Sequence, residues 1–399
     1  MTTTVDTVVI GGGASGVVAA ISAARTGKKV MICEQLPAIG KKILATGGGK
    51  CNLLNEHLDP ACYNPAAQRL VAAVFARFGK EQIKQFFSQL GLFCYTDSDA
   101  RVFPVTNQAA TVVKVLELEL KRLGVAISCD SPVTGLRAGT RGFRVELAGD
   151  RAVACTAVVI AGGGKTYPAL GGKGTCYRLA QAFGHTVVEP VAVAVPLIVK
   201  DRICHLLQGQ KIAAAVTSLI AGQRIARVTG DLLFTAYGLS GTAVLDSSRD
   251  IALALHRAPP RDAAVLVDWV PFMDSRQLLS VLKKRYSLAG RNGKADLLTG
   301  ILPQKCSFLC QDVNAPADLD RLAARLKETK FTVSATRGWN EADFTAGGVA
   351  VPEVSEATLE SKLQKGLYFC GEVLDVDGKR GGYNLAWAWA SGYCAGSGN

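Results

Sequence analysis

An apolar segment near the start of the chain runs directly into a glycine pattern. Residues 8–10 are predicted to form a buried strand, and Gly11, Gly13 and Gly16 then open an apolar helix over residues 17–24. In such a strand–turn–helix unit the first glycine allows the tight turn, the second lets a pyrophosphate approach the backbone, and the third brings helix and strand together. The N–H groups at the helix N-terminus can then bind phosphate oxygens. The pattern therefore predicts a bound dinucleotide.

A second strand, residues 29–33, ends at Glu34. This acid follows the glycine pattern by about 20 residues, which is where a carboxylate accepts hydrogen bonds from the adenosine ribose. The apolar start of the chain could instead be a signal peptide or a membrane anchor. No Lys or Arg precedes it, however, and its glycines stand at the positions that a dinucleotide needs. We expect a cytoplasmic protein with no membrane span.

Charge and cysteine content narrow the classes of ligand. The 399 residues carry a formal net charge of +12, which favours anionic ligands such as dinucleotide phosphates or a substrate with a carboxylate. The positive charge is dispersed rather than collected in tracts, so no nucleic-acid partner is predicted. The 12 cysteines are scattered without a C-x-x-C pattern and the chain has four histidines, so no metal site is predicted. The sequence does not indicate the oligomeric state.

The two ends of the chain share an α/β pattern, and the middle differs from both. Strands are predicted at residues 157–160 and 367–369, each before a Gly-rich turn, and the second turn leads into an apolar helix over residues 384–394. The middle predicts four strands, residues 191–199, 213–220, 223–228 and 231–235, and three helices, residues 278–286, 295–309 (with a break at Pro303) and 318–327. The simplest architecture is a discontinuous dinucleotide domain with an antiparallel or barrel-like domain and a helical appendage inserted.

Five segments together resemble one family over nearly the whole chain. They are residues 9–16, 40–52, 161–167, 344–349 and 367–384. The family consists of bacterial FAD flavoproteins related to the dehydro-bile-acid ene reductase of gut clostridia and to aminoacetone oxidase. The resemblance implies a two-part Rossmann-like FAD domain, residues 1–190 and 352–399. It also implies a β-barrel-like substrate domain, residues 191–267 and 328–351, and a helical domain, residues 268–327.

The glycine motifs and the resemblance together predict where FAD binds. At the adenosine diphosphate half we expect the cofactor to contact Gly11, Gly13, Ala14, Ser15, Gly16 and Glu34, with Val133 at the adenine. Beneath the pyrophosphate and the flavin ring we expect Lys42, Gly47, Gly48, Gly49, Lys50, Cys51 and Asn52. The other predicted cofactor-binding residues are Ala161, Gly162 and Gly163 in a second turn and, near the end of the chain, Gly371, Glu372, Gly382, Tyr383, Asn384 and Leu385. The N-terminus of the last helix would stabilise negative charge on the reduced flavin.

The resemblance implies NAD(P)H-dependent reduction of a carbon–carbon double bond in an apolar, anionic enone such as a 3-oxo-dehydro bile acid. Such a reaction needs a donor for the carbonyl oxygen and a source of a proton. Arg337 is the candidate cation, and Tyr167 and Tyr237 are candidate donors. NAD(P)H would visit the flavin transiently, because the chain lacks a second complete nucleotide-binding unit.

Two other functions remain open. One is an FAD amine oxidase of the aminoacetone oxidase type that passes electrons to O₂, with the ammonium held by Asp231, Glu341 or Asp343. The other is a flavin-bearing protein that binds nucleic acid or a partner, which the absence of a basic tract disfavours.

Overall fold

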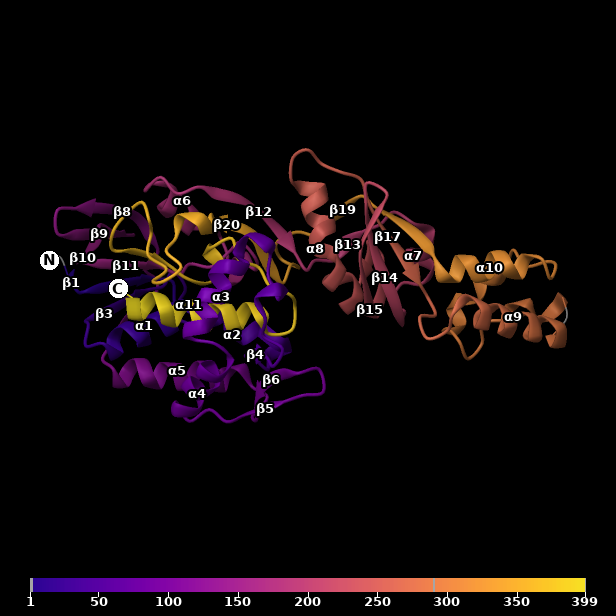
Figure 1. Cartoon of the computed structure of the whole chain (residues 1–399), viewed down its shortest axis with the longest axis horizontal. Coiled ribbons are helices and arrows are strands. Elements are labelled where there is room, and N and C mark those ends of the chain that lie inside the picture. The colour runs from indigo at the N-terminus through magenta and orange to yellow at the C-terminus, as the bar shows by residue number, and fades with distance from the viewer. Residues whose placement is uncertain (1–2, 290, 399) are drawn as a thin grey trace. The chain divides into compact units, whose positions relative to one another are not determined.

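The structure, a computed structural model, describes residues 3–289 and 291–398. The chain divides into two compact units (Figure 1). The first combines Met1–Pro190 with Phe344–Asn399, and the second is Val191–Asp343. Both ends of the chain thus belong to one unit. The assignment of an FAD domain, a substrate domain and a helical domain with the predicted boundaries stays a prediction.

The first unit contains a five-stranded sheet in the order β21-β11-β2-β3-β7, in which every neighbouring pair is parallel. Its strands are β2 (Thr7–Ile10), β3 (Val30–Cys33), β7 (Ala126–Ser128), β11 (Ala157–Ile160) and β21 (Leu367–Phe369). All residues of β2, β11 and β21 are buried, which is usual where helices cover both faces of a parallel sheet. Because parallel strands end at the same edge, the turns that follow these three strands meet there.

Helix α1 (Ala14–Arg25) lies beside α11 (Tyr383–Gly398), although the two are far apart in sequence (Figure 1). Small residues allow the two backbones to approach. A Cβ at Gly392 or Gly396 of α11 would collide with the carbonyl oxygens of Ser15 and Ala19 in α1. The last helix of the chain therefore packs directly on the helix of the first βαβ unit.

Other elements complete the first unit. Its other helices are α2 (Lys41–Ala45), α3 (Gln68–Arg77), α4 (Lys80–Gln89), α5 (Ala109–Arg122) and α6 (Thr175–Gln181). One further sheet has the order β1 (Thr3–Thr4), β10 (Arg151–Cys155), β9 (Gly142–Leu147) and β8 (Val133–Gly139). Another has the order β4 (Leu54–Asn55), β6 (Arg101–Pro104) and β5 (Cys94–Thr96). Two more strands, β12 (Val187–Val193) and β20 (Phe344–Val349), pair with each other. Strands β9 and β10 pair antiparallel and form a hairpin.

The second unit is built on a seven-stranded sheet in the order β18-β17-β14-β15-β16-β13-β19. Its strands are β13 (Leu197–Ile198), β14 (Lys211–Ile220), β15 (Gln223–Thr235), β16 (Gly238–Ser240), β17 (Ala263–Asp268), β18 (Thr329–Val333) and β19 (Ala335–Thr336). Every described ladder is antiparallel, as predicted. No ladder among the described strands joins the two edges, so the expectation of a barrel is corrected to an open sheet.

Several predicted elements of this unit differ in the structure. The two strands predicted at residues 223–228 and 231–235 form the single strand β15. Gly230 lies within this strand and makes room for α8 (Thr242–His256), since a Cβ at Gly230 would lie 2.7 Å from Thr242 Oγ1. The predicted strand over residues 191–199 is split into β12 and β13 near Ala194, whose φ is +50°. The predicted helix over residues 295–309 is wrong. Two 3₁₀ segments, Arg291–Asp296 and Gln304–Cys310, stand there, with Pro303 and the left-handed Gly300 between them.

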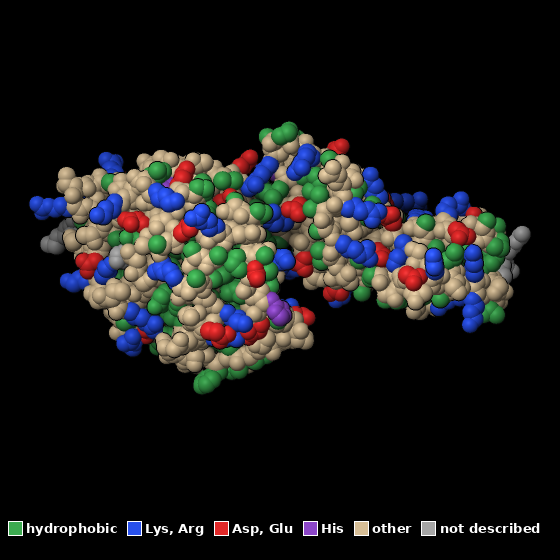
Figure 2. All heavy atoms as spheres, viewed as in Figure 1, with side chains coloured by type: hydrophobic (Ala, Val, Ile, Leu, Met, Phe, Trp, Pro, Cys, Tyr) green, Lys and Arg blue, Asp and Glu red, His purple; other side chains and the backbone are tan. Residues whose placement is uncertain are grey.

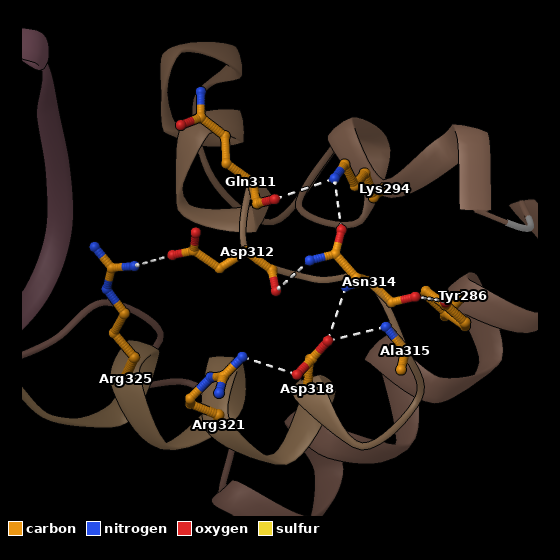
Figure 3. A network of polar contacts seen from close by, with 9 residues as sticks. All are labelled: Tyr286, Lys294, Gln311, Asp312, Asn314, Ala315, Asp318, Arg321 and Arg325. Carbon is orange, nitrogen blue, oxygen red and sulfur yellow. Dashed lines mark hydrogen bonds and ion pairs between the residues drawn. The ribbon is translucent and has the colours of Figure 1, made fainter.

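This unit also contains the helices α7 (Arg202–Leu206), α9 (Ser275–Ala289) and α10 (Asp318–Lys327). A polar network holds the start of α10 (Figure 3). Asp318 accepts the N–H groups of Asn314 and Ala315 at 2.8 and 2.9 Å, and Lys294 Nζ donates to Asn314 Oδ1 at 3.2 Å. The network satisfies its own polar groups and stabilises the helix start. Within the described residues, no helix is long and apolar enough to cross a bilayer.

His185, just after α6, is a structural group. Its side chain is fully buried, with Nδ1 3.0 Å from Glu353 Oε2 and Nε2 2.7 Å from Ser361 Oγ. When Nδ1 carries the proton it donates to the carboxylate, and Nε2 accepts from the hydroxyl. The ring therefore links the end of α6 to the segment that returns to the parallel sheet.

Replacement of His185 by Ala is expected to lower the free energy of unfolding by about 1–3 kcal/mol, because Glu353 and Ser361 lose a buried partner. Burial lowers the pKa of His185 below its ordinary value. The unfolded chain therefore takes up a proton near pH 6.5 that the folded protein resists, and stability is lost as the pH falls below that value. Urea unfolding at pH 8 and pH 5.5 measures both effects. A wild-type pH dependence that His185→Ala retains in full would contradict this assignment.

Candidate cofactor site

The turn after β2 uses its three glycines for different reasons. A Cβ at Gly16 would collide with the carbonyl oxygen of Gly11, and one at Gly11 would lie 2.6 Å from the carbonyl oxygen of Ala161. Packing within the protein therefore requires these two glycines. A Cβ at Gly13 would meet no atom within 4 Å. The protein itself gives no reason for glycine at Gly13, whereas a closely approaching pyrophosphate does.

Glu34 closes the same turn from the end of β3. Its Oε2 accepts the N–H of Gly12 at 2.6 Å, and its Oε1 accepts the N–H of Leu36 at 2.8 Å. The backbone of Glu34 accepts the N–H of Ser131 at 2.8 Å, which places the start of β8 at Val133 near the acid. Each carboxylate oxygen can accept a further bond. The structure thus brings together the two residues predicted at the adenosine end.

The loop that includes Thr46–Gly49 departs from the ordinary backbone regions. Gly47, Gly48 and Gly49 have φ of +57°, +64° and +85°, and the non-glycine Cys51 has φ of +62°. A Cβ at Gly48 or Gly49 would meet no atom within 4 Å. Burial raises the pKa of the Cys51 thiol to about 12, so Cys51 is not a thiolate near neutral pH. The loop over residues 46–51 therefore presents backbone that no side chain covers at Gly48 and Gly49, rather than a reactive group, and we call it the bare loop.

The second Gly-rich turn, after β11, combines packed and open positions. Ala161 donates its N–H to the carbonyl oxygen of Ile10 at 2.9 Å, which ties this turn to the end of β2. A Cβ at Gly162 would collide with the Cys176 sulfur, whereas one at Gly163, whose φ is +71°, would meet no atom within 4 Å. Gly13 and Gly163 are therefore two open glycines in turns that follow neighbouring strands.

Lys42, in α2, connects this region to the turn after β21. Its Nζ donates to Thr166 Oγ1 at 2.6 Å and to Glu372 Oε2 at 2.8 Å. Glu372 Oε1 also accepts the N–H of Thr345 at 2.7 Å, and Gly371, with φ of +76°, donates its N–H to Ser391 Oγ at 2.9 Å. The Lys42 and Glu372 charges neutralise each other, and their hydrogen bonds to Thr166 and Thr345 hold the turns in place.

The N-terminus of α11 is shaped by a tight turn. Gly381 and Gly382 have φ of +109° and +106°, and a Cβ at Gly382 would lie 2.5 Å from the carbonyl carbon of Leu54. Asn384 Oδ1 accepts the N–H of Gly378 at 2.9 Å, and the Tyr383 carbonyl accepts the Tyr63 hydroxyl at 2.7 Å. Leu385, in the first turn, is half-buried. Asn384 and Tyr383 therefore fix the loop and helix start, while the first-turn N–H groups have no partner inside the helix.

Among the described residues of this unit, two buried side-chain atoms have no hydrogen-bond partner, Asn52 Oδ1 and Tyr177 Oη. Buried polar atoms are nearly always paired, so each orphan points to a missing partner. Asn52 follows the bare loop, and burial raises the pKa of Tyr177, with Glu372 as the next contributor. An orphaned acceptor together with four open glycines fits a polar ligand with a phosphate-bearing part, as FAD has.

The three candidate catalytic residues separate into two groups. In the second unit, the Arg337 guanidinium lies 4.6 Å from the centre of the Tyr237 ring, and its Nε donates to Glu341 Oε1 at 2.6 Å. The structure thus brings two of them together. Tyr167, in the first unit, is half-buried and has φ of +51°, a strained value for a residue with a side chain.

The sequence reasoning missed four residues that help to form this region. Thr166 and Thr345 bind the Lys42–Glu372 pair, Ser391 holds Gly371, and Tyr177 carries the second orphaned atom. Thr166 and Thr345 lie inside segments that carry the family resemblance, which could have marked them. Ser391 and Tyr177 lie within helices and had no local signal.

Comparison with known proteins identifies the family. The HI0933-like protein Rossmann domain family matches residues 5–398. The chain belongs to this family. The membership confirms the predicted family and the Rossmann-like α/β fold, and it makes the chain an FAD-dependent oxidoreductase of the HI0933-like type. It does not specify the substrate or the electron donor.

Curated relatives cover nearly the whole chain. The 3-dehydro-bile acid delta(4,6)-reductase of Clostridium scindens is 40% identical over 97% of this chain and 97% of its own length. The ribosomal RNA dihydrouridine synthase of Escherichia coli is 30% identical over 98% of this chain and 97% of its own. Among solved structures, the 3-ketosteroid delta1-dehydrogenase of Sterolibacterium denitrificans has a TM-score of 0.52 and 13% identity, with 99% of both chains covered, which shows a shared fold.

Proposed function

We propose that the protein reduces a carbon–carbon double bond conjugated to a carbonyl group, with NAD(P)H as the electron donor. The observation that carries the proposal is a set of glycines with open space at the Cβ position, Gly13, Gly48, Gly49 and Gly163, in a chain that is 40% identical to a reductase of a 3-dehydro bile acid. The proposed substrate is an apolar enone with an anionic group. The net charge of +12 suits such an anion.

In this proposal FAD binds to the predicted residues of the first unit. Gly13 and Gly163 admit the pyrophosphate, Glu34 accepts hydrogen bonds from the ribose, and the Gly48–Gly49 loop and the N-terminus of α11 hold the flavin part. Bound FAD supplies a ring that can accept and donate a hydride. The ion pair between Lys42 and Glu372 holds α2 against the turn that follows β21.

The predicted role of Arg337 is to bind the substrate carbonyl oxygen. A guanidinium has five N–H groups and stays charged at neutral pH. The ion pair with Glu341 involves Nε and Nη2, which leaves Nη1 for a substrate. Tyr237, whose ring lies against the guanidinium, and Tyr167 remain the candidate proton donors.

A second candidate is the reduction of uracil in RNA, because one relative is named a ribosomal RNA dihydrouridine synthase. Dihydrouridine is uridine whose ring C=C bond, also conjugated to a carbonyl, has been reduced. On the face shown in Figure 2, Lys and Arg side chains are mixed with acids and form no continuous tract. Together with the higher identity to the bile acid reductase, this favours a small-molecule substrate.

The amine oxidase alternative has weaker support. It needs carboxylates that can hold an ammonium group. Of the predicted carboxylates, Asp231 lies 3.1 Å from Lys211 Nζ and Glu341 pairs with Arg337, so both already have a cation of their own.

The purified protein is expected to be yellow and to release FAD, not FMN, on acid treatment. Under anaerobic conditions NAD(P)H should bleach the flavin, and a 3-oxo-dehydro bile acid should restore the colour. Visible absorbance follows both half-reactions. Primary amines and uracil-containing RNA serve as the other two arms.

Bleaching by an amine and recovery with O₂ would establish the oxidase instead. Recovery with RNA alone would establish the second candidate. Release of FMN, or of no flavin, would overturn the proposal at the cofactor.

A further inference from the structure

Asn52 carries a buried acceptor that the protein leaves unused. The residue is 8% exposed, and its Oδ1 has no hydrogen-bond partner. An unpaired polar atom in such a place destabilises the folded protein by about 1–3 kcal/mol. A donor from outside the chain would remove that penalty.

The surroundings of Asn52 are those of a ligand site. A Cβ at Gly382 would lie 2.9 Å from Asn52 Oδ1, so this oxygen lies against the turn that starts α11. A Cβ at Gly47 would lie 2.8 Å from the Asn52 backbone nitrogen, so Asn52 also directly adjoins the bare loop. The orphaned acceptor, the open backbone of Gly48 and the N-terminus of a 16-residue helix therefore occur together.

These groups match one edge of a flavin. The pyrimidine edge of the isoalloxazine ring has a single donor, N3–H, between two carbonyl oxygens. A helix N-terminus offers donors and positive potential to a carbonyl, whereas the N3–H needs an acceptor. Asn52 Oδ1 is the orphaned acceptor beside that helix.

We propose that Asn52 Oδ1 accepts the N3–H of the flavin ring and that Asn52 thereby recognises the pyrimidine edge. This inference rests on the proposed binding of FAD and assigns a specific role to one residue. Asn52 is a positioning residue, because it orients the ring through N3–H and does not touch the atoms that react.

The test is the binding of FAD and of 3-methyl-FAD, in which a methyl group replaces the N3 hydrogen. The protein is freed of flavin and titrated with each cofactor, with flavin fluorescence as the readout. Wild type should bind FAD at least about 10-fold more tightly than 3-methyl-FAD, which is the scale of one buried hydrogen bond. Asn52→Ala should bind FAD more weakly and should not discriminate, because it has neither the acceptor nor the bulk that opposes the methyl group.

Asn64 provides the matched control. It is 7% exposed, and both polar atoms of its amide are paired, with Nδ2 donating to the Asp375 carbonyl at 3.1 Å and Oδ1 accepting the Asp377 N–H at 3.1 Å. Asn64→Ala should lose stability and still discriminate between the two flavins. Equal binding of both flavins by wild type, or discrimination that survives in Asn52→Ala, would overturn the proposal.

A second variant covers the case in which Asn52→Ala does not fold. Asn52→Asp keeps an acceptor and adds negative charge, so it should still discriminate and should lower the midpoint potential of the flavin in a dye-equilibration titration. Loss of discrimination in Asn52→Asp would overturn the role of Asn52. A wild-type protein that binds neither flavin would instead overturn the proposed function.

Discussion

Gly13→Val is expected to give a folded protein that is isolated without flavin. Gly13 has φ of −78° and ψ of −172°, a region that valine readily adopts, and a Cβ there would meet no protein atom within 4 Å. Any large loss must therefore come from the space that the ligand needs. Valine adds three carbons, and overpacking of this kind destabilises by about 1–3 kcal/mol, so FAD binding should weaken by about 10- to 10²-fold.

The measurement is the ratio of flavin to protein after purification, together with circular dichroism and thermal unfolding. Gly13→Ala, with one added carbon, should retain part of the flavin. Gly16→Ala is the contrasting control, because its Cβ would collide with the Gly11 carbonyl oxygen and should lower stability itself. A fully yellow Gly13→Val protein would show that the turn does not approach a pyrophosphate.

The parallel sheet could be predicted because its signals are local. Each of β2, β11 and β21 is a short apolar run followed by glycines, and the glycines mark turns at the same edge. The βαβ arrangement also accounts for β3 lying beside β2. What local signals could not show is that α11 packs on α1 through Gly392 and Gly396, because these glycines act on a partner more than 350 residues away.

In the second unit the same kind of local reasoning led to errors. Two separate strands were predicted at residues 223–228 and 231–235, yet Gly230 lies inside the single strand β15 where α8 approaches. The apolar spacing of residues 295–309 resembles that of a helix, but Gly300 and Pro303 prevent regular hydrogen bonding there. The helix α8 and the strand β17 were not predicted, although residues 263–267 of β17 are an apolar run typical of a buried strand.

The candidate site shows a similar division. The glycine motifs indicated which backbone segments meet, and the structure does bring Ala161 against Gly11. Which side-chain atoms are already used could not be predicted. Asn384 was predicted to bind the cofactor, but its amide is bonded to the Gly378 backbone, whereas Asn52 Oδ1 is unpaired. Both are asparagines in Gly-rich segments, and only their neighbours in space distinguish them.

Arg337→Ala is expected to slow the re-oxidation of reduced flavin by an enone by about 10²–10³-fold, the scale of losing one donor to an oxygen that gains negative charge. Flavin binding and the anaerobic reduction of the flavin should stay near wild-type values, because the proposed role of Arg337 is to bind the substrate and not the cofactor. Reduction with dithionite followed by rapid mixing with the enone isolates this step from the electron donor.

Two further variants separate a role in binding the carbonyl from a general effect of charge. Glu341→Gln removes the ion-pair partner and keeps the guanidinium against the Tyr237 ring, so the enone step should stay within about threefold of wild type. Arg321, which pairs with Asp318 in the same unit, is the matched control, and Arg321→Ala should leave the step unchanged. An unchanged enone step in Arg337→Ala would remove Arg337 from the site. A comparable loss in Arg321→Ala would attribute the effect to net charge, because the two variants share only the loss of one paired cation.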